Sequence, residues 1–128
     1  MAANCRLVLS HVIGERSQEN ADQLVSNTAK RLRSMPLFVT DGLRLYAASL
    51  RKQYGKLQPF APTGKRGRPR SPKLTVDELL KYAQVIKMRA NGRLKKVVKR
   101  IIFGKDIDHK MISTSYIERQ NLTCRQDN

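Results

Sequence analysis

Two acidic residues in this sequence stand where a carboxylate can hold a divalent metal ion. Asp41 follows the apolar run 37–39 and precedes a glycine, so we expect it at the carboxyl end of a buried strand. Open α/β sheets present their ligand-binding groups at that end of the strands. Glu118 lies in the first turns of a helix expected from about residue 115. Carboxylate oxygens suit Mg²⁺, so metal-dependent chemistry is one interpretation of the pair.

Each carboxylate also has a purely structural interpretation. An aspartate just before a helix commonly serves as its N-cap, which would explain Asp41. The string Ser115-Tyr116-Ile117-Glu118 has the spacing of a capping box, in which the glutamate bonds back to the start of its own helix. Taken one at a time, the two residues favour these structural roles.

The elements that would position these residues alternate between strand and helix. The aliphatic run Cys5–Ile13, which ends at a glycine, predicts a strand. Ser17 is a suitable N-cap for a helix over about 18–33. A short strand over 37–39 and a second helix that ends near Gly55 follow. The apolar face of that second helix is expected to hold Leu43, Tyr46, Ala47 and Leu50.

The middle of the chain is strongly basic. The whole sequence carries 26 Lys and Arg against 10 Asp and Glu, a net charge of +16, which favours a polyanionic partner such as nucleic acid. Residues 56–73 hold four prolines, two glycines and six basic residues without an acid, and this composition predicts a linker. Beyond it, Asn91-Gly92 stands between two strand-like runs, 82–88 and 94–103, and predicts a basic β-hairpin.

Three sequence strings, taken in order, resemble one family. They are His11-Val12-Ile13-Gly14-Glu15-Arg16, then Val39-Thr40-Asp41-Gly42 with Leu45-Tyr46, then Tyr116-Ile117-Glu118-Arg119-Gln120-Asn121-Leu122-Thr123 with Arg125-Gln126. Together they resemble the DDE transposases of small bacterial insertion sequences, of the insertion-sequence-one type. The resemblance covers most of the chain outside 56–110, and it suggests a chain truncated at both ends.

This resemblance implies an α/β protein with a partial ribonuclease-H-like (integrase-type) fold. Residues 1–55 would form the N-terminal part of the catalytic core, without its opening strand. Residues 56–110 would be an inserted basic linker and β-hairpin. Residues 111–128 would supply a returning strand, from 112–114, and the glutamate-bearing helix.

The chemistry implied by the resemblance is DNA transposition, through metal-dependent phosphodiester cleavage and strand transfer. In this family three acids hold a pair of Mg²⁺ (or Mn²⁺) ions. Asp41 matches the second acid and Glu118 the third, as catalytic residues and metal ligands. The first acid belongs to a strand upstream of the matched segments, and no acidic residue precedes Glu15. We therefore expect poor or absent transposition by this chain alone. The alternatives are a catalytically inactive DNA-binding remnant that competes with full-length transposase, and a structural nucleic-acid protein of ribosomal style.

The expected DNA contacts lie on the basic segments and on the last helix. Arg-Gly-Arg-Pro within 64–70 resembles the core of an AT-hook, which lies in the narrow minor groove; a basic tether without base preference is the alternative. We hypothesise that 64–73 and the hairpin tip form one continuous DNA-facing surface. The predicted DNA-binding residues are Lys65, Arg66, Arg68, Arg70, Lys73, Arg93, Lys95, Lys96, Arg119, Asn121 and Arg125.

The expected partners follow from the same reasoning. They are DNA and either a second copy of the chain or the full-length transposase. No apolar run reaches the roughly 20 residues of a membrane span, and no signal peptide is recognisable, so we expect no membrane association. A cytoplasmic, nucleoid-associated location follows. Cys5 and Cys124 show no metal-ligand spacing and receive no role.

Overall fold

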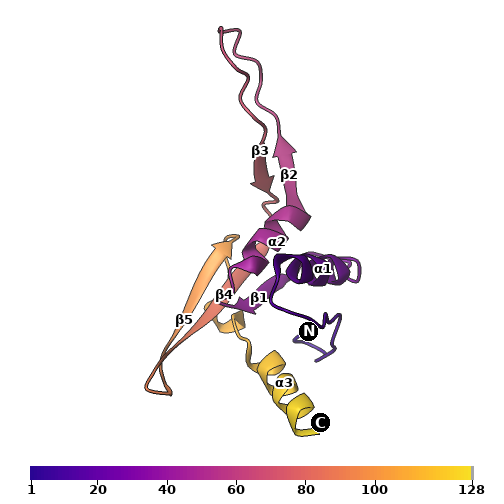
Figure 1. Ribbon diagram of the computed structural model, residues 1–128, viewed down its shortest axis with the longest axis vertical. Helices are drawn as coiled ribbons and strands as arrows, with labels where there is room; N and C mark the ends of the chain where they lie inside the picture. The colour runs from indigo at the N-terminus through magenta and orange to yellow at the C-terminus, as the bar shows by residue number, and fades with distance from the viewer. Residues whose placement is uncertain (128) are drawn as a thin grey trace.

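The computed structural model describes residues 1–127 as a mixed α/β protein with three α-helices and two sheets (Figure 1). A single 3-10 turn, His109–Met111, precedes the last helix. The elements in chain order are α1 (Gln18–Ala29), β1 (Leu37–Asp41), α2 (Leu45–Tyr54), β2 (Gly55–Gln58), β3 (Lys73–Val76), β4 (Lys81–Ala90), β5 (Arg93–Phe103) and α3 (Ser115–Asp127).

The larger sheet has the strand order β1-β4-β5. β1 pairs with β4 in parallel, and its register runs from Leu37 opposite Lys81 to Asp41 opposite Val85. β4 and β5 form the antiparallel hairpin predicted from Asn91-Gly92. Both turn residues have positive φ, 51° and 75°, as a tight two-residue turn requires. β4 extends beyond the end of β1, so the distal part of this hairpin leaves the core as a two-stranded ribbon (Figure 1).

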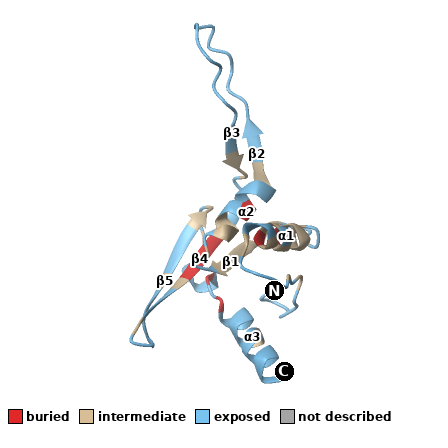
Figure 2. Ribbon diagram, in the orientation of Figure 1, coloured by how far each residue is buried: buried red, intermediate tan, exposed pale blue. Residues whose placement is uncertain are grey.

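One face of this sheet packs against α1 and α2. Its buried residues are Val25 from α1, Leu50 from α2, Leu80 just before β4 and Tyr82 within β4. Side chains in a strand alternate between faces, so Phe38 on β1 points to the same side as Tyr82, its register partner. The buried residues gather where β4 meets the two helices, whereas the projecting hairpins are mostly exposed (Figure 2).

The opposite face of the sheet has a smaller apolar cluster. Ala83 and Val85 of β4 pack there against Ile112, with Leu37 and Val39 of β1 beside them. Ile112 is fully buried, and it anchors the segment that leads into α3. This contact brings the start of α3 to the sheet. The helix itself extends away from the core, and none of its described residues is buried (Figure 1).

The segment predicted as a linker, 56–73, instead forms most of a long hairpin. β2 and β3 pair antiparallel, with Leu57 opposite Leu74, and residues 59–72 connect them without helix or strand. The composition of 56–73 did not predict these short strands, because it is dominated by the prolines and glycines of the connecting loop. β2 begins directly where α2 ends, at Gly55, where an added Cβ would lie 2.3 Å from the Arg51 carbonyl oxygen. We call residues 55–76 the arm.

The strand predicted over Cys5–Ile13 is wrong. This segment has no strand, and its one ladder contact is an isolated bridge between Ala2 and Leu7. Ser10 instead shares a hydrogen bond with Thr28 of α1, at 2.7 Å. Ile13 remains 90% exposed. A segment of β-forming composition becomes a strand only when a neighbouring strand pairs with its backbone N–H and C=O groups. The helix α1, which this segment contacts, cannot provide that pairing.

Most of the other predicted elements are present in the structure. The helix expected over 18–33 is present as α1 but ends at Ala29, and the Ser17 hydroxyl accepts its capping hydrogen bond from the Asn20 amide. The strand after it and the second helix are confirmed as β1 and α2, although α2 begins at Leu45 and so does not include Leu43. The returning strand expected at 112–114 is wrong, because this segment joins a 3-10 turn to α3. Asn128, included in the predicted helix, lies outside the described residues.

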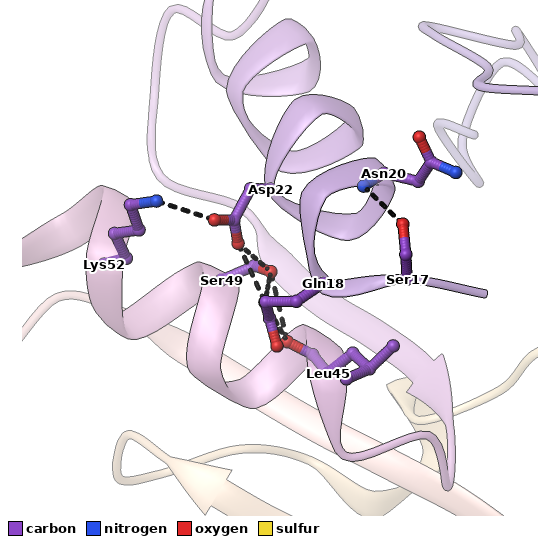
Figure 3. Close-up of polar contacts among 7 residues, drawn as sticks. All are labelled: Ser17, Gln18, Asn20, Asp22, Leu45, Ser49 and Lys52. Carbon is purple, nitrogen blue, oxygen red and sulfur yellow. Dashed lines mark hydrogen bonds and ion pairs between the residues drawn. The ribbon is translucent and has the colours of Figure 1, made fainter. Parts of the chain in front are cut away.

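A polar cluster joins α1 to α2 (Figure 3). The carboxylate of Asp22 accepts hydrogen bonds from the Ser49 hydroxyl at 2.6 Å, the Lys52 ammonium at 2.7 Å and the Gln18 amide at 2.8 Å. Ser49 is buried, so its hydroxyl needs these partners. Hydrogen bonding to Lys52, then to Ser49 and Gln18, lowers the pKa of Asp22 from 3.8 to about 2. The cluster therefore fixes the spacing of the two helices that cover the sheet.

We predict that Asp22→Asn lowers the thermal unfolding midpoint, whereas Glu78→Gln, at an exposed carboxylate, does not. The folded pKa of Asp22 lies below its unfolded value, so its contribution to stability is present above about pH 3.8 and is lost as the pH falls towards 2. Thermal melts monitored by circular dichroism between pH 2 and 7 should therefore give unfolding midpoints for the wild type and Asp22→Asn that converge at low pH. A constant difference across that range would contradict this role.

Candidate active site and nucleic-acid interface

Asp41 is the last residue of β1 and is exposed. One of its carboxylate oxygens accepts a hydrogen bond from the Leu43 amide at 3.3 Å, which closes a local turn. The alternative of a helix N-cap is not observed, because α2 is preceded by Arg44 and has no side-chain cap. The Asp41 charge also helps to raise the pKa of Tyr46, which is raised chiefly by burial. The second carboxylate oxygen has no hydrogen bond from the described residues.

A buried polar network holds the turn that carries Asp41. The hydroxyl of Tyr82, beneath α2, lies 2.8 Å from the Thr40 hydroxyl and accepts a hydrogen bond from the Gln84 amide at 2.8 Å. That amide also donates to the Leu43 carbonyl at 3.4 Å. Tyr82 and Gln84 are 0% and 5% exposed, so breaking these bonds would leave buried polar groups unpaired, at a cost of about 1–3 kcal/mol each. The network therefore fixes residues 40–43 against β4.

Glu118 lies in the first turns of α3, and its two carboxylate oxygens have different partners. One forms an ion pair with the Lys87 ammonium on β4, and the other accepts a hydrogen bond from the Thr114 hydroxyl at 2.6 Å. Hydrogen bonding to Lys87, and then to Thr114, lowers the pKa of Glu118. The predicted capping box is not formed, because Ser115 is the first helical residue and Glu118 bonds to Thr114.

The fold brings Asp41 and Glu118 to the same face of the sheet. Asp41 follows Leu37 and Val39 on β1, and its register partner Val85 is two residues before Lys87 on β4. Strand alternation places Lys87 on the face of Val85, and Lys87 binds Glu118. No hydrogen bond joins the two acids, and residues 1–127 contain no cluster of three metal-ligating His, Cys, Asp or Glu side chains.

Sequence reasoning missed the residues that hold this site. Thr114 could have been suspected from its position four residues before Glu118, one helical turn away. Lys87 lies in the strand-like run 82–88, and only the strand register together with the position of α3 reveals that it faces an acid. Gln84 carries no recognisable signal in the sequence.

The basic residues expected in the AT-hook-like segment lie in the loop of the arm. All of this loop is exposed. Gly64 and Gly67 have φ values of +66° and +147°, and nothing lies within 4 Å of a Cβ added at either. The guanidinium of Arg70 lies 5.8 Å from the centre of the Phe60 ring, a cation–π contact across the loop. The residues of this group are Lys65, Arg66, Arg68, Arg70 and, at the start of β3, Lys73.

The other predicted DNA-binding residues lie on two further elements. Arg93, Lys95 and Lys96 are exposed at the tip of the β4–β5 ribbon, and Arg119, Asn121 and Arg125 are exposed on α3. The single continuous surface expected from the arm loop and the ribbon tip is not formed. Figure 1 places these two tips at opposite ends of the molecule, because β2–β3 and β4–β5 leave the core in opposite directions.

Comparison with known proteins gives no relative: no family model matches the chain, and no curated protein or solved structure is similar to it. None of the α-helices between residues 1 and 127 combines the length and the apolar character that crossing a bilayer requires.

We predict that Lys87→Gln raises the pKa of Glu118 towards its ordinary value, because it removes the largest cause of the lowering. A carbon-detected NMR titration of the Glu118 carboxyl group would measure the change. Lys95→Gln, at the ribbon tip, is the matched control and should leave this pKa unchanged. An unchanged Glu118 pKa in the Lys87 variant would show that the ion pair does not persist in solution.

Proposed function

We propose that the chain belongs to the DNA-binding catalytic core of a DDE-type transposase, with a ribonuclease-H-like architecture. One observation carries the proposal. A parallel strand pair places Asp41 at a carboxyl strand end, and Lys87 holds Glu118 on the same face of the neighbouring strand. These are the two acids that the sequence resemblance assigns to the metal site. The net charge of +16 supports a polyanionic substrate.

The donor atoms suit the metal that this chemistry requires. Asp41 and Glu118 present exposed carboxylates, the hard oxygen ligands that Mg²⁺ and Mn²⁺ prefer. When bound, the metal would activate the nucleophile and stabilise the leaving oxygen at a DNA phosphodiester. The resemblance calls for three acids, and residues 1–127 contain no group of three metal-ligating side chains. The chain alone should therefore bind metal weakly and catalyse poorly.

Hydrogen bonds within the protein orient the two acidic residues of this site. The Tyr82–Gln84 network orients the turn after Asp41, and Thr114 orients Glu118. Lys87 binds the Glu118 oxygen that is not bonded to Thr114, so its ammonium group would compete with a metal ion for that oxygen. A displaced Lys87 ammonium group would remain beside the site, where it can form an ion pair with a DNA phosphate. Substrate and metal should thus bind more tightly together than separately.

A second candidate is a DNA-binding protein without catalysis, which would compete with an active transposase at the ends of the element. The lack of a three-acid group among residues 1–127 favours it. Both proposals place the protein on DNA in the nucleoid. They differ in whether the Asp41–Glu118 face takes up metal.

We predict that Mn²⁺ broadens the backbone amide NMR signals of residues 41–43, 85–87 and 118 before those elsewhere. Asp41→Asn and Glu118→Gln should each weaken the effect severalfold, because each removes an anionic ligand. Asp106→Asn, at an exposed acid after the ribbon, is the matched control. Broadening centred elsewhere, or unaffected by both site substitutions, would refute the metal site. DNA binding without this broadening would favour the non-catalytic candidate.

A further inference from the structure

The positive charge of the chain is concentrated on its two hairpins. The arm, residues 55–76, contains six Lys and Arg and no acid, and the β4–β5 ribbon, residues 81–103, contains eight and no acid. The remaining sequence holds twelve basic residues against ten acidic ones. The body between the hairpins is therefore close to neutral, and two separate cationic elements project from it.

The ribbon tolerates its charge because of its register. Each of its cations that has a cross-strand partner in the hairpin lies opposite an uncharged residue, as with Lys96 opposite Met88 and Arg93 opposite Ala90. This arrangement avoids the cost of like charges placed directly across a sheet. Towards the turn, Arg89, Arg93, Lys95 and Lys96 are all exposed. A strand pair of this kind has the width that the major groove of duplex DNA admits.

The arm presents its charge differently. Four of its six basic residues, Lys65, Arg66, Arg68 and Arg70, lie in the extended loop at the tip, whereas Lys56 and Lys73 lie on the paired strands. Open space around Gly64 and Gly67 lets this thin backbone lie close to a surface. A narrow chain with flanking arginines suits the minor groove, where the negative potential is enhanced. Each hairpin carries four exposed cations at its distal end, Lys65, Arg66, Arg68 and Arg70 on the arm and Arg89, Arg93, Lys95 and Lys96 on the ribbon, so each tip can contact a duplex by itself.

We infer that a single chain holds two separate segments of duplex DNA, one at the arm loop and one at the ribbon tip. The two tips face away from one another across the body (Figure 1). Duplex DNA is stiff over about 150 base pairs, so a short duplex seated across one tip cannot bend round to the other. This inference rests on the DNA binding in the proposed function, and it adds that the protein bridges two DNA segments without needing a second copy.

The test counts duplexes bound per chain. Native mass spectrometry with duplexes of about 12 base pairs, roughly one helical turn, reports the numbers of chains and duplexes in each complex. We expect two duplexes on one chain. An arm variant (Lys65, Arg66, Arg68 and Arg70 to Gln) and a ribbon variant (Arg89, Arg93, Lys95 and Lys96 to Gln) should each bind one. A control variant (Arg16, Lys30, Arg31 and Arg33 to Gln), with the same loss of charge on exposed residues of the body, should still bind two.

A second measurement follows bridging directly. Donor-labelled and acceptor-labelled duplexes should show energy transfer with the wild-type and control proteins, and lose it with either hairpin variant. The inference is overturned if the wild type binds one duplex per chain, or if either hairpin variant keeps two or loses both. It is also overturned if bridging complexes contain as many chains as duplexes. A wild-type chain that binds no duplex at low salt would instead refute the proposed DNA binding itself.

Discussion

Parallel hydrogen bonding between β1 and β4 is the constraint on which the candidate site depends. It joins segments that are separated in sequence by α2 and the whole arm, and it sets Asp41 beside Val85. β4 continues past the end of β1. Lys87 therefore lies on this extension, which is not paired with β1, on the same face as Asp41, where it forms an ion pair with Glu118. Beneath this face, Tyr82 and Gln84 hold the Asp41 turn from the opposite side of the sheet. A register shift of one residue would turn Lys87 away from α3 and separate the two acids.

Lys87 links the candidate site to the electrostatics of the whole molecule. It lies at the base of the cationic ribbon, and its partner Glu118 is the one acid that forms an ion pair with the ribbon among residues 1–127. The ion pair neutralises a charge that would repel the other ribbon cations, and it anchors the otherwise exposed α3. Release of Lys87, by metal or by DNA, would therefore change both the charge of the ribbon and the position of the helix. In the proposed function, this single contact would couple metal binding to DNA binding.

The sequence predicted the elements whose signals are local. The Ser17 cap, the apolar spacing of α1 and α2, and the Asn91-Gly92 turn each depend on neighbouring residues, and all three are confirmed. The strand over Cys5–Ile13 was wrong because pairing depends on a distant partner, which β propensity does not supply. The arm was missed because its strands are short and its loop dominates the composition. For the site, the sequence supplied Asp41 and Glu118, whereas Lys87, Thr114 and Gln84 emerged only from the register and the packing.

The central claim is that Asp41 and Glu118 share a metal ion. Crystals of the protein soaked in millimolar Mn²⁺, with diffraction data collected at the manganese absorption edge, test it most directly. The account predicts an anomalous peak within coordination distance of a carboxylate oxygen from each residue, with the Lys87 ammonium displaced from Glu118. An anomalous peak elsewhere, or no peak while the Lys87–Glu118 pair remains intact, would contradict it.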